Sequence, residues 1–241
     1  GEGDENLIHF IRFAKELHKD NCKIILQCSD NAIELMVNQK WIDEVVTEDN
    51  IPEHDYHVYI GSLVRVLQCN PNDILQDYPY LESGINKVEN FVKDKINIGV
   101  VFETNRESSA HDDESIDEDV ISNIFNNSHN VICLDEKITN ENLPAFYDKN
   151  FNYTNLDELS RFVSSLDLII TVDHLVAHIA GALNVNTILI LPCVPNWRWE
   201  ITHRHTTPWY KSVTIFRQET PGDWKSVVKN IKEKLEGYNH V

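Results

Sequence analysis

The second half of the sequence alternates short apolar runs with amphipathic segments. Apolar runs rich in β-branched residues read INIGVVFE, NVICLD, LDLIITV, NTILILP and VTIFRQ. Helical spacing of apolar residues lies between most of them, at residues 116–125, 156–165 and 174–183, and again at 224–235. Strands that alternate with helices form a parallel sheet with helices on both faces. The sequence therefore predicts a doubly wound α/β fold for this half.

The first half is predicted to be a second, smaller α/β unit, with residues 1–90 as one domain and 91–241 as the other. Two Rossmann-like domains that face a cleft are typical of enzymes that grip a ligand between them. The chain opens with GEGDEN and no initiator Met, so we expect that preceding residues, including a first strand, are missing. The predicted elements are helices at 5–20, 31–38 and 85–93 and strands at 22–28, 44–47 and 57–60.

The composition excludes several classes of function. The formal net charge is −18, so nucleic acids and anionic membrane surfaces are disfavoured as main partners. No apolar run approaches the roughly 20 residues of a membrane span, and no signal peptide opens the chain. The 5 cysteines are scattered without CxxC spacing, which favours free buried thiols. We therefore expect a cytoplasmic protein.

The stretch LDLIITVDHLVAHIAGAL at residues 166–183 predicts a ligand site. A buried strand ends at Val172, and Asp173 is placed to cap the helix that follows. Ligands of open α/β sheets bind at the carboxyl ends of strands, and a helix N-terminus there attracts anions such as phosphate. On spacing alone, Asp173 is more often only a helix cap, and His178 is more often a hydrogen-bonded core residue than a ligand contact.

This stretch resembles the signature D-x-x-I-T-V-D-T-x-x-A-H-x-A-G-A-L of glycosyltransferase family 9, the heptosyltransferase-like enzymes. Four later blocks, PNWRW, TPWY, IFRQ and GDW, are similar to the glycosyltransferase-like domains that follow tetratricopeptide (TPR) repeats in bacterial proteins. The opening GEGDENLIHFIRFAKEL resembles the family's G-L-G-D-x-I-x-F-x-R-Y, and DYHVYIGSL resembles its D-x-x-x-x-L-x-S-L segment. The resemblance spans nearly the whole chain and implies a preceding TPR region.

The resemblance implies the two-domain fold called GT-B and an inverting, metal-independent transfer of a sugar from a nucleotide-diphosphate sugar. No cofactor is implied beyond this donor, and the acceptor is a hydroxyl of a glycan, a lipid-linked molecule or a protein. Asp4 matches the family's general base in the opening loop. The implied donor-binding residues are Asp173, His174, Leu175, His178, Gly181, Arg106 and Arg198.

The sequence departs from the family pattern where a basic D-x-x-R-S segment is expected. Residues 111–117 read HDDESID, so Glu114 stands in place of a cation that would neutralise the departing diphosphate. Arg106, Arg198 and Arg217 are the cations that could replace it. The alternative function is therefore a degenerate transferase fold that binds a ligand or a protein without turnover.

Other features have plainer interpretations beside functional ones. Asp4 is equally well a solvated acid. His203 and His205 suggest a metal site but lack further ligands at metal-binding spacing, so a solvated loop is favoured, and the acidic residues 111–119 are favoured as an exposed helix start over a cation site. The tryptophans of the late blocks either stack on a sugar or base or pack the final crossover. An epimerase acting on nucleotide sugars is a third, weaker candidate.

Overall fold

The structure is a computed structural model of the 241-residue chain. It describes residues 2–19, 22–69, 74, 78–84, 91–102, 116, 118–134, 147–148, 153–199 and 205–237.

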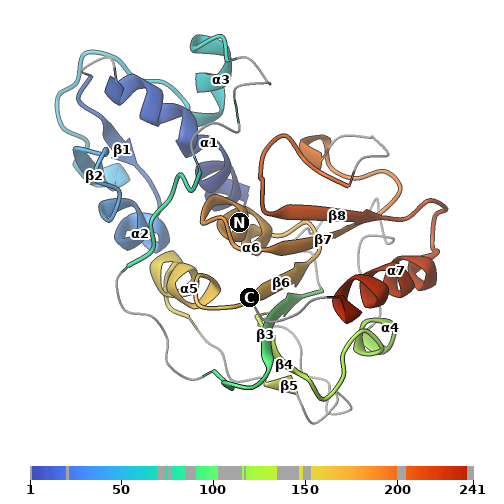
Figure 1. The fold of residues 1–241 in the computed structure, drawn as a ribbon. Helices are drawn as coiled ribbons and strands as arrows, with labels where there is room; N and C mark the ends of the chain where they lie inside the picture. The colour runs from blue at the N-terminus through green and yellow to red at the C-terminus, as the bar shows by residue number, and fades with distance from the viewer. Residues whose placement is uncertain are drawn as a thin grey trace.

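The larger part of the described chain is a parallel sheet of 6 strands in the order β5-β4-β3-β6-β7-β8 (Figure 1). The order runs outward in both directions from the β3–β6 pair, which is the doubly wound Rossmann order. The chain therefore changes direction between β3 and β6, and the loops after these two strands diverge to opposite faces. The strands are β3 (Ile96–Val101), β4 (His129–Cys133), β5 (Tyr147–Asp148), β6 (Leu168–Thr171), β7 (Thr187–Leu191) and β8 (Val213–Arg217).

Helices cover both faces of this sheet. Strand residues alternate between two hydrophobic clusters, so that Ile98 and Ile170 face one layer and Ile169 and Leu189 the other. The helices α4 (Glu118–Ser122) and α7 (Trp224–Glu236) pack on the first face, and α5 (Leu156–Val163) and α6 (Leu175–Ala182) pack on the second. This confirms the α/β fold with a parallel sheet.

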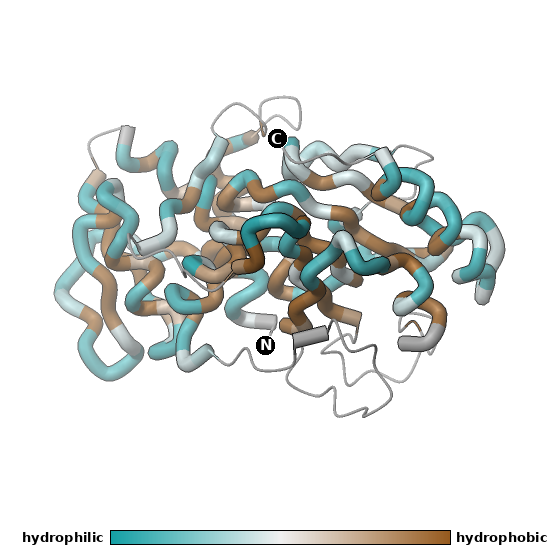
Figure 2. The backbone as a smooth tube through the Cα atoms, turned by 60° about the horizontal axis from the view of Figure 1, so that its bottom comes forward, coloured by the Kyte–Doolittle hydropathy of each residue, from teal (hydrophilic) through white to brown (hydrophobic). Residues whose placement is uncertain are grey.

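The first part of the chain is built on a parallel pair of strands, β1 (Ile25–Gln27) and β2 (Glu44–Val46). It also holds α1 (Glu2–Lys19), α2 (Ile33–Val37) and α3 (Leu63–Val66). Helix α1 packs on α6 and α2 packs on α5, so one hydrophobic cluster runs through both parts. Figure 2 shows the hydrophobic stretches gathered in the interior of the elongated molecule, with hydrophilic turns around them.

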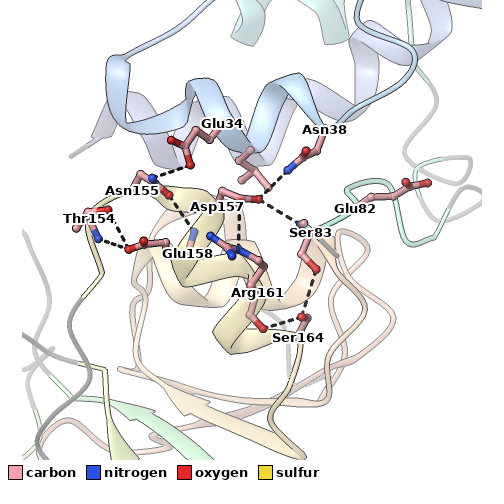
Figure 3. A network of polar contacts seen from close by, with 12 residues as sticks. Glu34, Asn38, Glu82, Ser83, Thr154, Asn155, Asp157, Glu158, Arg161 and Ser164 are labelled. Carbon is pink, nitrogen blue, oxygen red and sulfur yellow. Dashed lines mark hydrogen bonds and ion pairs between the residues drawn. The ribbon is translucent and has the colours of Figure 1, made fainter. Parts of the chain in front are cut away.

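Polar contacts reinforce the α2–α5 junction (Figure 3). The buried carboxylate of Asp157 on α5 accepts hydrogen bonds from Asn38 Nδ2 at 2.8 Å and from the backbone N–H of Gly84 at 3.2 Å, and it pairs with Arg161 at 3.0 Å. Asn155 donates to Glu34 of α2 at 2.9 Å. The two parts of the chain are therefore joined by apolar and polar contacts, and the division at residue 90 stays a prediction.

Several local predictions differ from the structure. Residues 57–59 form no strand because this run pairs with none of the described strands: Tyr59 is 83% exposed, and a 3-10 turn, Ile60–Ser62, follows. Residues 2–4 belong to helix α1 and not to a loop. The short β5 was not predicted, and most of the predicted helix at 85–93 lies outside the described residues.

All 5 cysteines are free thiols, but only Cys133 is fully buried. Among the described helices, none combines the length and apolarity needed to cross a membrane.

Candidate functional site

The turn between β6 and α6 lies at the carboxyl end of a strand next to the point where the sheet order reverses. Helix α6 begins at Leu175, and its N-cap is His174, whose Nδ1 accepts from the backbone N–H of Val176 at 3.2 Å. The prediction that Asp173 is the cap is therefore wrong by one residue, because the helix starts one residue later than expected. Asp173 is buried in the turn beside the cap.

The other α6 residues of the predicted donor site face the interior. Leu175 is buried in the core, and His178 is fully buried, with its Nδ1 2.7 Å from the hydroxyl of Tyr210 and its ring stacked on Trp199. Gly181 lies against Tyr210, where an added Cβ would come within 2.3 Å of the ring. The structure thus gives His178 and Gly181 packing contacts, and their role in donor binding stays a prediction.

Asp4 lies in the first turn of α1, next to the loop that follows β1. Its carboxylate accepts from Ser29 Oγ at 2.7 Å and from Asn31 Nδ2 at 3.1 Å. Burial raises the pKa of the neighbouring Cys28 thiol to about 11, and the charges of Asp4 and Asp30 add to the rise. Asp4 is therefore held by neutral donors at the carboxyl end of β1.

Arg198 joins the start of α1 to the larger sheet. It lies in the 3-10 turn Trp197–Trp199, in the segment that follows β7, and its side chain is 7% exposed. Its Nη2 donates to Asn6 Oδ1 on α1, two residues from Asp4. The first turns of α1 thus lie between two loops at carboxyl strand ends, the loop after β1 and the segment after β7.

Two arginines of this region keep unused hydrogen-bond donors. Nε of Arg198 and both Nε and Nη1 of Arg217 are buried and find no acceptor among the described residues, and neither guanidinium pairs with a carboxylate there. Arg217 ends β8, and its Nη2 donates to the carbonyl of Trp199 at 3.0 Å. Burial lowers the pKa of Arg217, although an arginine remains a cation at neutral pH.

Arg12 of α1 shows the opposite arrangement. Its Nε donates to the carbonyl of His9 at 2.9 Å, and its two Nη atoms donate to Tyr78, Tyr80 and the carbonyl of Trp209 at 2.6–2.9 Å. Its guanidinium also lies 4.2 Å from the ring centroid of Tyr80. Arg12 is therefore bound by the protein itself, whereas Arg198 and Arg217 keep nitrogens that have no acceptor among the described residues.

A buried histidine pair completes the α1–α6 contact. His9 Nδ1 lies 3.0 Å from the hydroxyl of Tyr210, which His178 also contacts. Burial lowers the pKa of His9, and the nearby His178, Arg12 and Arg198 lower it further, so His9 is neutral at physiological pH. Burial likewise raises the pKa of Tyr210 well above its ordinary value. We name this group the α1 polar cluster: Asn6, His9, Arg12, Tyr78, Tyr80, His178, Arg198 and Tyr210.

The α1 polar cluster was not predicted from the sequence. Its signal is the spacing of Asn6, His9 and Arg12, which recur every three residues and share one face of a helix that otherwise looks amphipathic. Arg106 and residues 111–115, together with His203 and Arg204, lie outside the described residues. Where the structure describes the chain, it holds no group of three or more His, Cys, Asp or Glu side chains that could bind a metal ion.

Comparison with solved structures identifies heptosyltransferases as similar folds. TibC, a dodecameric iron-containing heptosyltransferase in complex with ADP-D-β-D-heptose, aligns with 92% of this chain at 14% identity and a TM-score of 0.59. A second structure of TibC, from enterotoxigenic E. coli H10407, aligns with 93% at 14% identity and a TM-score of 0.56. The E. coli ADP-heptose LPS heptosyltransferase II aligns with 95% of this chain and 97% of its own length, at 10% identity and a TM-score of 0.53.

These similarities establish the fold class. This chain spans 62% of the TibC chain in either structure. No protein-family model matches the sequence, and no curated protein is significantly similar to it. The chain therefore has a glycosyltransferase-like α/β fold with parallel sheets, similar to that of heptosyltransferases.

Proposed function

We propose that this chain is a glycosyltransferase domain that transfers a sugar, with inversion, from a nucleotide-diphosphate sugar to a hydroxyl acceptor. The observation that carries the proposal is that three buried guanidinium nitrogens, Nε of Arg198 and Nε and Nη1 of Arg217, find no acceptor among the described residues at the carboxyl edge of the large sheet. In a chain with a net charge of −18, a buried cation without an acidic partner is suited to an anionic ligand. The similarity to a heptosyltransferase solved with ADP-heptose supports a nucleotide diphosphate as that anion.

Each residue of the proposed site has a distinct role in the transfer. The diphosphate binds between the β6–α6 turn and the two arginines, where the N-terminus of α6 adds a positive dipole end. Asp4 accepts the proton of the acceptor hydroxyl as its oxygen attacks the anomeric carbon. The bond from that carbon to the phosphate oxygen breaks, and Arg198 and Arg217 stabilise the charge that develops on the departing diphosphate. Arg217 thereby supplies the cation that the family pattern places where Glu114 stands.

Metal independence and a cytoplasmic location are part of this proposal, as is a TPR region preceding the chain. TibC is iron-containing, and the metal independence proposed for this chain rests on its resemblance to glycosyltransferase family 9.

Calorimetric titration with ADP, UDP and GDP, and with the corresponding monophosphates, tests the donor site. Arg217→Gln removes the unused donors, so we expect diphosphate affinity to fall by about 10- to 100-fold, the value of one or two charge-assisted hydrogen bonds, with little effect on the monophosphates. Arg65→Gln removes an equal charge from an exposed position on α3 and serves as the control. Equal diphosphate affinity of both variants would overturn the assignment of Arg217.

Turnover is tested separately with Asp4→Asn, which keeps an oxygen to accept from Ser29 but removes the base. We expect this variant to bind the nucleotide sugar and to lose transfer and donor hydrolysis by about 100-fold or more. If the wild-type chain binds nucleotide diphosphates yet releases no nucleotide, and Asp4→Asn behaves identically, the chain is a binding module with a transferase fold. If no nucleotide binds at all, the proposed function is wrong.

A further inference from the structure

The tryptophans of the late sequence blocks differ sharply in exposure. Trp199 is 1% exposed and stacks on His178, and Trp209 donates its Nε1 hydrogen to the carbonyl of Arg198 at 2.7 Å. Trp197, in contrast, is 63% exposed. A large aromatic ring left in water within a short, otherwise packed turn is costly to folding and indicates a binding surface.

Trp197 is held in place although it is exposed. Its ring lies nearly parallel to Phe10 of α1, with centroids 6.3 Å apart and an angle of 18° between the planes. The guanidinium of Arg198 lies 5.1 Å from the centroid of the same ring. Because the indole is already ordered, a ligand that stacks on it loses little free energy to immobilising the side chain.

The same loop carries one exposed apolar side chain and one oriented polar group. Val194, in the same loop, is 60% exposed. The Oδ1 atom of Asn196 accepts from the backbone N–H of Arg198 at 3.1 Å and from its Nη1 at 3.4 Å. These bonds fix the amide, and its Nδ2 group donates to no described residue. An amide donor thus lies one residue from the exposed indole.

We propose that residues 194–197 form a carbohydrate-binding platform, on which the apolar C–H face of a pyranose ring stacks on Trp197 while Asn196 Nδ2 donates to a ring hydroxyl. A pyranose fits because the platform combines an apolar face with one oriented amide donor, which is how pockets fix the orientation of such ligands. The contact of Trp197 with Phe10 places the platform beside α1, the helix that carries Asp4. If the proposed function is right, the platform binds the acceptor, and the acceptor is a glycan.

Fluorine NMR of the chain labelled with 5-fluorotryptophan tests this proposal. The chain has 5 tryptophans, and Trp197→Phe identifies the resonance of residue 197. We expect methyl β-D-glucopyranoside, methyl β-D-galactopyranoside or methyl α-D-mannopyranoside to shift that resonance saturably. The partly exposed Trp41 and Trp224 serve as internal controls and should not shift. No response to any glycoside, equal responses at all three positions, or a response only to adenosine or uridine would overturn the platform.

Two variants separate the stacking from the hydrogen bond. Asn196→Asp keeps an oxygen to accept from Arg198 but has no N–H donor, so the glycoside affinity should fall by about 3- to 10-fold with the fold unchanged. Trp197→Ala should weaken it by about tenfold or more in a calorimetric titration. Unchanged affinity in both variants contradicts the proposal.

The outcome is independent of the donor site. Nucleotide binding without a glycoside response at Trp197 defeats the platform and leaves the proposed function standing. A glycoside response without nucleotide binding does the reverse.

Discussion

Helices α1 and α7 look alike in the sequence, yet the structure surrounds them differently. Both have apolar residues at helical spacing and both carry charged residues between them. In α7 only Val227, Val228, Ile231 and Leu235 are buried, and the lysines face solvent. In α1 nearly every residue from 5 to 14 is buried, including Glu5, His9 and Arg12. The difference arises because α7 covers the outside of the sheet, whereas α1 lies between the two parts of the chain.

An amphipathic sequence pattern identifies the apolar face of a helix but does not show what its polar face contacts. On α7 the polar face meets water, which solvates it without further contacts. On α1 the polar face meets α6 and the 78–84 segment, so each polar group needs a protein partner. The α1 polar cluster supplies these partners, and the following predictions test how much more it contributes than the surface of α7.

The largest expected effect is that of Arg12→Met. The substitution keeps the apolar length of the side chain but removes the charge-assisted hydrogen bonds that Arg12 donates to the carbonyls of His9 and Trp209 and to the hydroxyls of Tyr78 and Tyr80. We expect the free energy of unfolding to fall by about 3–5 kcal/mol. Urea denaturation measures this, with the exposed Arg65→Met as a control that should stay within about 0.5 kcal/mol of the wild type. A loss as small as the control's would mean that the burial of α1 does not depend on this cation.

The next effect is expected for Gly181→Ala, on the side of α6 that holds Tyr210. The added Cβ would lie 2.3 Å from a Tyr210 ring atom, so the ring, whose hydroxyl contacts both His9 and His178, must shift. We expect a destabilisation of about 1–3 kcal/mol, measured by the thermal unfolding midpoint. Gly3→Ala in α1 has nothing within 4 Å of its Cβ and should be neutral or slightly stabilising. If both variants behave alike, the close packing of α6 on Tyr210 is not required.

The buried His9 of α1 is expected to make the stability of the fold depend on pH. The pKa of His9 is lowered in the folded chain from 6.5, first by burial and then by His178, Arg12 and Arg198, so only the unfolded chain takes up this proton as the pH falls below 6.5. Stability therefore falls with decreasing pH, by up to about 1.4 kcal/mol per pH unit from His9 alone. His9→Gln keeps a hydrogen-bonding group toward Tyr210 without titrating. Its unfolding free energy should change less with pH across this range, and an unchanged slope would contradict the assignment.

The smallest effect is expected on α7. Asp223 caps this helix by accepting from the backbone N–H of Ser226 at 3.2 Å, so Asp223→Ala should cost about 1 kcal/mol. The exposed Lys229–Glu233 pair, 3.9 Å apart, should contribute no more than about 0.5 kcal/mol. Chemical denaturation of Asp223→Ala and Lys229→Ala measures the two losses in unfolding free energy. A loss for Lys229→Ala as large as that for Arg12→Met would mean that the polar faces of α1 and α7 contribute equally to stability.

The sequence predicted five of the six strands of the large sheet because each of these is a short apolar run closed by turn residues, as at LDLIITVD, whereas the two-residue β5 carries no such run. The prediction failed where a local pattern depends on a distant partner. Residues 57–59 have the composition of a strand but pair with none of the described strands. The N-cap of α6 is His174 and not the predicted Asp173, because helix ends depend on where the preceding strand stops.

The candidate site was predictable in its location and less so in its members. Asp173 and His174 do lie at the carboxyl end of a strand beside the reversal of the sheet order. The unused donors of Arg198 and Arg217 and the exposure of Trp197 depend on what each side chain meets in three dimensions, and the spacing of the residues does not encode this.

The placement of α1 between the two parts also bears on how the chain can be cut. A shortened chain that begins after residue 21 would leave the buried face of α6 open to water, with Tyr210 and His178 deprived of His9. Such a fragment should aggregate alone, and a synthetic peptide of residues 2–19 added in trans should rescue it. Helix α1 and the rest of the chain would then assemble from two separate molecules. The junction after α1 is therefore a suitable site at which to split the protein into two parts that reassociate.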